Sequence, residues 1–302
     1  MDPAFPPVII EVALNGVVAT KASPAVPRTT AALIASAEAC IAAGASIVHF
    51  HVSDASLVGE RAAAAYLEIW QPVAERYPAA LFYPTVAFVG SVTERFAHLE
   101  LLAECGALRL GLVDPGSLNL GVADPRGVPL PLDLVYINSF RDIHHQLALC
   151  ARHRLGPSIS IFEPGFLRAT RSFAAAGLLP TTGAMIKLYF GGDFGYLGSS
   201  PGVSFGLAPS RIALAAYREL LIGLDHPWMV AVMGGDVLAT EIAEQAVDLG
   251  GHLRVGLEDY AGPEQPSNDT LVARAAALIR DRGRQVATAE QAAAILRLPP
   301  RT

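Results

Sequence analysis

Residues 43–51 read Ala43-Gly44-Ala45-Ser46-Ile47-Val48-His49-Phe50-His51 and lead from the end of a predicted helix into a short apolar strand that finishes on two histidines. A glycine directly after a helical run commonly ends the helix. The short apolar run that follows is typical of a strand buried on both faces of a parallel sheet. This stretch therefore predicts a helix-to-strand unit of an α/β protein.

The same alternation of apolar and amphipathic runs continues along nearly the whole chain. Strands are expected near residues 8–13, 46–51, 80–85, 108–112, 158–162, 185–189, 228–232 and 253–257. Helices are expected near residues 29–43, 62–75, 92–105, 143–154, 170–176, 210–221, 237–249 and 268–280. Eight such units predict a (β/α)8 TIM barrel, and a doubly wound open sheet is the alternative.

A single domain is expected for residues 1–302, because no linker or low-complexity tract interrupts the chain. An extra helical segment at about residues 283–302 is expected to pack outside the barrel. With 52% hydrophobic residues, the chain has more apolar side chains than one barrel interior readily takes up. This surplus predicts a homo-oligomer.

Charge and cysteine content limit the partners and the compartment. The formal net charge of −6 argues against a nucleic-acid surface, which normally needs a basic stripe. Charged residues interrupt every apolar stretch before it reaches the ~20 residues that span a membrane, so no membrane partner is expected. Three cysteines, an odd number, and an N-terminus without secretory features predict a cytoplasmic protein.

The two histidines at the end of the second strand predict a metal site. Positions two apart in a strand share a face, and imidazole is a common zinc ligand. In a closed barrel the last strand pairs with the first and the first with the second, so Glu258 would lie beside His49 and His51. The three residues predict a zinc site, which would also suit iron, manganese or cobalt. Two hydrogen-bonded core histidines without a metal are the alternative.

Glu11 is the other unusual residue of the barrel strands. It interrupts the otherwise apolar first strand, Val8-Ile9-Ile10-Glu11-Val12-Ala13. A carboxylate buried without a partner is costly, so a metal or a cationic side chain is expected beside it.

These residues and the run Gly250-Gly251-His252-Leu253-Arg254-Val255-Gly256-Leu257-Glu258-Asp259 resemble the β-keto acid cleavage enzymes, which include the 3-keto-5-aminohexanoate cleavage enzyme. The resemblance extends nearly from end to end. It implies a metal-dependent TIM barrel that takes a small-molecule β-keto acid and acetyl-CoA and gives acetoacetate and a new acyl-CoA. It also implies that His49, His51 and Glu258 are the metal ligands.

The resemblance implies roles for further residues. Asp259 would be the general base, and Arg254 would orient it. The adjacent cation predicts a depressed pKa for Asp259. A salt bridge at the bottom of the barrel is the alternative role for Arg254. The expected substrate-binding residues are Glu11, Asn15, Thr85 and Ser117.

The chain departs from the family's usual pattern at several positions, of which two bear directly on the chemistry. Ser53 stands where an arginine is usual, and Ser160 stands where an acidic residue is expected. Two alternatives to the cleavage enzyme therefore stay open. One is a metal-dependent hydrolase, in which the metal would activate water. The other is a non-catalytic protein that binds a keto acid or an acyl ligand.

Overall fold

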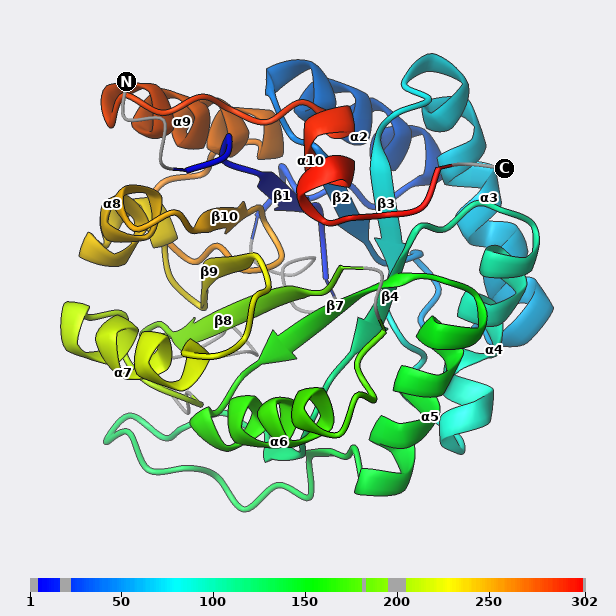
Figure 1. Cartoon of the computed structure of the whole chain (residues 1–302), viewed down its shortest axis with the longest axis horizontal. Helices are drawn as coiled ribbons and strands as arrows, with labels where there is room; N and C mark the ends of the chain where they lie inside the picture. Colours follow the sequence, from blue (N-terminus) through cyan, green and yellow to red (C-terminus); the bar gives the residue numbers. More distant parts are fainter. Residues whose placement is uncertain (1–4, 17–22, 181–182, 195–204, 301–302) are drawn as a thin grey trace.

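Eight parallel strands form the wall of a barrel in a computed structural model of the chain, which describes residues 5–16, 23–180, 183–194 and 205–300. The predicted TIM barrel is confirmed (Figure 1). The strands are β1 (Ile10–Ala13), β2 (Ile47–Phe50), β3 (Leu81–Pro84), β4 (Leu110–Val113), β7 (Gly156–Ile161), β8 (Met185–Gly191), β9 (Trp228–Met233) and β10 (His252–Val255). The hydrogen-bonded order is β3-β2-β1-β10-β9-β8-β7-β4, and β3 packs against β4 where the barrel closes. The expected domain limits, residues 1 and 302, lie outside the described residues.

Helices surround the strands on the outside of the barrel (Figure 1). They are α2 (Thr30–Ala43), α3 (Gly59–Arg76), α4 (Val92–Glu104), α5 (Phe140–Arg152), α6 (Pro164–Ala175), α7 (Arg211–Leu221), α8 (Glu241–Asp248) and α9 (Asn268–Asp281). Hydroxyl side chains begin several of them. Ser91 and Ser139 each form a capping box with an acidic residue three positions later, which satisfies two backbone N–H groups at the helix start.

Two helices differ from their predicted ranges. Helix α6 begins at Pro164, six residues before the expected start, because proline fits the first helical turn, where no N–H partner is needed. The single helix expected at 237–249 is divided into the 3-10 helix η1 (Val237–Ala239) and α8. Thr240 separates the two, since its backbone is extended.

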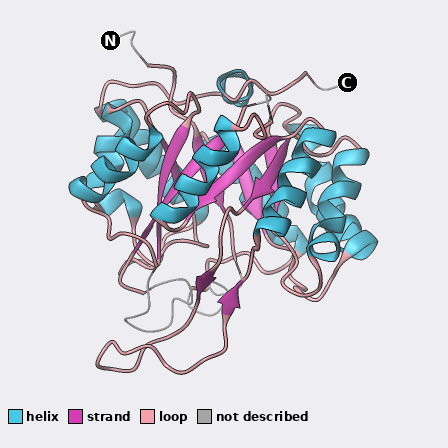
Figure 2. Ribbon diagram, turned by 60° about the horizontal axis from the view of Figure 1, so that its bottom comes forward, coloured by secondary structure: helices cyan, strands magenta, loops and turns pink. Residues whose placement is uncertain are grey.

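A two-stranded antiparallel hairpin after β4 was not predicted. Its strands are β5 (Leu118–Asn119) and β6 (Val135–Tyr136), which pair Leu118 with Tyr136. Strands of two residues carry no alternation that a sequence pattern can detect. In Figure 2 the hairpin projects from the barrel on the side opposite the two chain termini.

The C-terminal segment packs at the other end of the barrel. It contains α10 (Ala289–Ile295), and Arg109 near the start of β4 donates a 2.7 Å hydrogen bond to the carbonyl of Pro299. Ser46 at the start of β2 similarly donates to the carbonyl of Ala287. The ends of the strands away from the hairpin are thereby covered. Among the helices in the described part of the chain, none is long and apolar enough to cross a membrane.

Candidate metal and substrate site

Four neighbouring strands bring the predicted site residues together. Glu11 on β1 lies opposite Arg254 on β10, and Ala13 on β1 lies opposite His49 on β2. His49 in turn lies opposite Tyr83 on β3. The predicted closure of the barrel, with the last strand beside the first, is therefore what places these residues at one end of the barrel interior.

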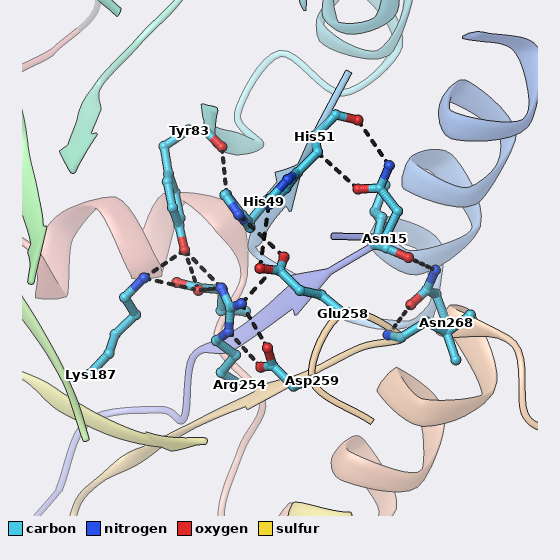
Figure 3. A network of polar contacts seen from close by, with 12 residues as sticks. Asn15, His49, His51, Tyr83, Lys187, Arg254, Glu258, Asp259 and Asn268 are labelled. Carbon is cyan, nitrogen blue, oxygen red and sulfur yellow. Dashed lines mark hydrogen bonds and ion pairs between the residues drawn. The ribbon is translucent and has the colours of Figure 1, made fainter. Parts of the chain in front are cut away.

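His49, His51 and Glu258 form the candidate metal centre (Figure 3). His49 Nε2 lies 3.3 Å from Glu258 Oε2, and His51 Nε2 lies 3.4 Å from Glu258 Oε1. One potential ligand atom from each residue falls within 4.8 Å of the other two. Both histidines are buried. This is the two-histidine, one-carboxylate donor set expected from the sequence.

The hydrogen bonding of this trio fits a bound metal. His49 Nδ1 lies 3.1 Å from the Tyr83 carbonyl, so it donates there and leaves the lone pair of Nε2 to face the cluster. Among the described residues, His51 Nδ1 and Nε2 and Glu258 Oε2 are buried without a hydrogen-bond partner. Burial lowers the pKa of His49 to about 4, which keeps the imidazole neutral as a ligand must be. Buried polar atoms left without partners are rare, and a divalent cation would satisfy His51 Nε2 and Glu258 Oε2 together.

Asn15 and Gly16, at the end of β1, position the candidate metal ligands. The Asn15 side chain accepts a 2.8 Å hydrogen bond from the His51 backbone N–H and donates a 2.9 Å bond to the His51 carbonyl. Gly16 has a φ of +76°, and a Cβ there would lie 2.5 Å from Glu258 Cγ. Only glycine fits both the backbone conformation and the close approach. The predicted substrate contact Asn15 thus holds the backbone of His51, a candidate metal ligand, in place.

Arg254 connects two buried carboxylates. Its Nε and Nη2 donate to the two oxygens of Asp259 at 2.7 and 3.0 Å, and its Nη1 donates to Glu11 at 2.8 Å. Its Nη2 also lies 3.5 Å from Glu258 Oε2. The cationic partner expected for Glu11 is therefore Arg254. The salt bridges lie beside the candidate metal ligands, not at the bottom of the barrel.

The pKa of Asp259 differs from the sequence-based expectation. Burial raises it to about 6, although the Arg254 guanidinium acts in the opposite direction and Glu258 adds to the increase. The expected depression was wrong because removing the carboxylate from water outweighs one adjacent cation. Glu11 shows the opposite balance: burial alone would raise its pKa, but Lys187, Arg254 and Tyr83 hold it below the usual range.

Two residues of this network were missed from the sequence, Tyr83 and Lys187. The Tyr83 hydroxyl donates to Glu11 and accepts from Lys187 at 2.8 Å and from Arg254 at 3.0 Å. The Tyr83 ring stacks on the His49 imidazole with centroids 4.5 Å apart. Lys187 interrupts the apolar run Met185-Ile186-Lys187-Leu188-Tyr189 as Glu11 interrupts the first strand. The same criterion, one charge within an apolar strand, would have found it.

Two cavities meet at the candidate metal centre. One, of about 170 Å³, is lined by His49, Glu258 and Arg254, and the other, of about 260 Å³, by His51. Thr85 lines both, which fits its predicted role at the substrate.

Among the other predicted site residues, Asn15 lines the larger cavity, whereas Ser117 and Asp259 line neither. The hydroxyl of Ser117 exchanges hydrogen bonds with the backbone of Asn138, and Ser117 lines neither cavity. Asp259 lines a small void of about 10 Å³ next to Arg254.

The two positions that depart from the family pattern have different surroundings. Ser53 donates a 2.6 Å hydrogen bond to the carbonyl of Arg28 on the wall of the larger cavity. Ser160 lies opposite Lys187 on the neighbouring strand and lines the smaller cavity. Glu163 accepts a hydrogen bond from the Gly206 backbone, so its carboxylate holds a loop.

Fold and site together define a TIM-barrel protein with a buried two-histidine, one-carboxylate centre beside an arginine–aspartate pair. The model of the beta-keto acid cleavage enzyme family matches residues 7–298, and the chain belongs to that family. It is therefore an acyl-transferring enzyme that cleaves a carbon–carbon bond.

Proteins of known activity are similar over almost the whole chain. The 3-oxoadipate:acetyl-CoA acetyltransferase of Cupriavidus necator is 29% identical over 301 residues, which cover 97% of this chain and 95% of that protein. The 3-keto-5-aminohexanoate cleavage enzyme of Fusobacterium nucleatum is 26% identical over 297 residues, which cover 96% of this chain and 97% of that enzyme.

Solved structures with low sequence identity share the fold. The ternary complex of ObcA with a C4-CoA adduct and oxalate has a TM-score of 0.67 and 18% identity, and the match covers 91% of this chain and 68% of that one. The type I 3-dehydroquinate dehydratase of Clostridium difficile has a TM-score of 0.54 and 11% identity, with 92% and 94% of the two chains covered. At these identities the similarity is one of fold.

Proposed function

We propose that this protein is a metal-dependent β-keto acid cleavage enzyme that transfers an acyl fragment between a β-keto acid and acetyl-CoA, forming acetoacetate and a new acyl-CoA. The observation that carries the proposal is the buried cluster of His49, His51 and Glu258 beside the Arg254–Asp259 pair. Family membership supports it, as does the activity in the name of the Cupriavidus necator relative.

His49, His51 and Glu258 would hold the metal, with zinc as the first choice and another divalent transition metal as the alternative. The unpartnered buried atoms of His51 and Glu258 support this assignment. A metal bound there would supply a Lewis acid that polarises the keto oxygen of the substrate.

Asp259 is the proposed general base. Its raised pKa, about 6, supports this role, because a carboxylate of higher pKa takes up a proton more readily and is still ionised at neutral pH. Arg254 holds both oxygens of Asp259 and separates them from the smaller cavity. Catalytic contacts often tighten only when the substrate is bound, so a small shift of this pair would bring the carboxylate to the substrate.

The remaining residues divide into substrate contacts and positioning residues. Thr85 would offer a hydroxyl to a substrate oxygen, since it lines both cavities. Asn15 would act through His51, and Glu11 through Arg254. Ser117, bonded to Asn138 outside both cavities, is left out of this assignment.

Metal content and product formation test the proposal together. Metal would be measured by elemental analysis in the wild type and in His49→Ala, with His252→Asn as a control in which a buried histidine of another strand is replaced. Acetoacetate formation from a panel of β-keto acids would then be measured on the same samples, with and without acetyl-CoA. Metal in the wild type and control but not in His49→Ala, together with product that requires acetyl-CoA, is the expected result.

Other outcomes correspond to the alternatives. Product without acetyl-CoA would favour a metal-dependent hydrolase. Saturable binding of a keto acid without product would favour a non-catalytic binding protein. Absence of metal from wild-type protein purified with zinc present would refute the proposed centre.

A homo-oligomer in the cytoplasm is the proposed physiological form. Apolar side chains that are exposed in the monomer along and after the hairpin support self-association, including Leu132, Ile137 and Phe140. Light scattering after gel filtration would measure the mass, and a monomer at micromolar concentration would contradict this part of the proposal.

A further inference from the structure

Lys187 is a buried cation that the proposed reaction does not yet use. It lies in the middle of β8, its side chain is 1% exposed, and it lines the smaller cavity together with His49 and Glu258. Lysine is almost never fully buried unless it is paired, because its ammonium group loses strong hydration. Some interaction must therefore compensate for the hydration that the Lys187 ammonium group loses.

The hydrogen-bonding capacity of Lys187 is not filled within the protein. An ammonium group has three donors. Among the described residues, Nζ makes one hydrogen bond, 2.8 Å to the Tyr83 hydroxyl, and it lies 3.7 Å from Glu11 Oε1, which is too long for a second. Asp114 and Glu258 act on it only through longer-range electrostatic attraction. Lys187 therefore has donor capacity to offer to a ligand in the cavity.

Arg254 is the other cation that lines this cavity, and its situation is different. Each of its three nitrogens already donates to a carboxylate or to the Tyr83 hydroxyl. Much of the remaining wall is apolar and consists of Leu112, Leu118, Leu120, Leu134, Phe162 and Phe205. Among the described residues, Lys187 is therefore the charged side chain of this cavity with donors free to bind an anionic group that enters.

We propose that Lys187 binds the carboxylate of the β-keto acid and so selects acids over uncharged ketones in the cavity beside the metal ligands. The nature of the anion rests on the proposed function, whereas the presence of an anion-binding lysine rests on the geometry of Lys187 alone. Tyr83, which accepts from Nζ, holds the ammonium in place for this contact.

Binding of two small probes tests the inference. Acetoacetate is the simplest stable β-keto acid, and methyl acetoacetate has the same keto group without the charge. Calorimetry with zinc-loaded protein would measure both for the wild type and for Lys187→Met. Acetoacetate should bind about 10- to 100-fold more weakly to the variant, as expected for the loss of a hydrogen bond between charged groups. The affinity for the ester should change by less than about twofold.

A second variant guards against a general disturbance of the buried network. Lys187→Gln keeps an amide donor for the Tyr83 hydroxyl but removes the charge, and thermal melting would show that both variants are folded. Loss of selectivity between acid and ester in the folded variants is the supporting result. A purely structural role would weaken both probes equally, and that result would overturn the inference. Absence of acetoacetate binding to the wild type would overturn it as well.

Failure of this inference is distinguishable from failure of the proposed function. Acetyl-CoA-dependent turnover by the wild type, combined with unchanged selectivity in Lys187→Met, would refute the lysine contact and leave the function intact. Lysine-dependent acetoacetate binding without turnover would support the lysine contact and contradict the proposed function.

Discussion

His252 is expected to make the stability of the protein depend on pH. It lies at the start of β10 and is fully buried, and its Nδ1 accepts a 3.0 Å hydrogen bond from the backbone N–H of Ile9. Burial, with a smaller contribution from the Arg284 guanidinium, lowers the pKa of this imidazole to about 3 from its usual 6.5. Protonation would remove the acceptor and place a charge in the core.

The sign and size of the effect follow from these two pKa values. Between pH 6.5 and about pH 3 the unfolded chain binds the proton and the folded chain does not, so the free energy of unfolding falls as the pH falls. The contribution is complete above pH 6.5 and is lost progressively toward pH 3. Since one pKa unit corresponds to about 1.4 kcal/mol, a change from pH 7 to pH 5 removes about 2 kcal/mol through this residue.

His252→Asn isolates this effect. The asparagine Oδ1 occupies nearly the position of the histidine Nδ1 and can accept from Ile9, but it does not titrate near neutral pH. Urea unfolding of the metal-free proteins at pH 7, 6 and 5 would give the free energy of unfolding of each.

The comparison between pH values cancels other contributions. The smaller side chain costs the variant stability at every pH, and the other titrating groups are common to both proteins. The wild type should therefore lose about 2 kcal/mol more than the variant between pH 7 and pH 5. Parallel pH dependences of the two proteins would refute the reasoning.

Four further predictions concern the site. Asp259→Asn should lower kcat by about 10²- to 10⁴-fold. In the wild type, kcat/KM should rise with pH through the Asp259 pKa of about 6, because only the ionised carboxylate accepts a proton. A flat pH profile would argue against Asp259 as the base. Gly16→Ala should lower the metal content found by elemental analysis, because the added Cβ would lie 2.5 Å from Glu258 Cγ. Gly127→Ala is the control and should leave the metal content unchanged, because Gly127 is also left-handed but has open space around it. Arg254→Met leaves Asp259 buried without its cation and should lower the free energy of unfolding in urea by about 3–5 kcal/mol; a change below about 1 kcal/mol would contradict this. Chelation should lower the melting temperature modestly, and unchanged melting after confirmed metal removal would count against a stabilising role of the metal.

The barrel could be predicted because its strands are marked locally. Each expected range is a short run rich in apolar residues between turn signals, and the eight expected ranges overlap the eight observed strands of the barrel. Helix ends were predicted best where a capping residue marks them, as at Ser91 and Ser210. The hairpin of β5 and β6 was missed, because strands of two residues show no alternation in the sequence and are defined only by their pairing with each other.

The candidate metal centre was accessible from the sequence for a topological reason. His49 and His51 share a strand face by the period of two, and barrel closure places Glu258 beside them. Glu11 was noticed as a charge in an apolar strand, and Arg254 is its partner in the structure. Lys187 carries the same signal and was overlooked.

The sequence by itself determined the alternation of strands and helices, the number of barrel units and the set of candidate metal ligands, because these depend on local pattern and on the order of the strands. Only the tertiary structure decided the balance of charges within the barrel. The raised pKa of Asp259, the assignment of Asn15 to His51 and the unfilled donors of Lys187 all depend on burial and on distances between residues remote in the chain. Electrostatic energies in a buried site are sums over such neighbours, and no local pattern contains them.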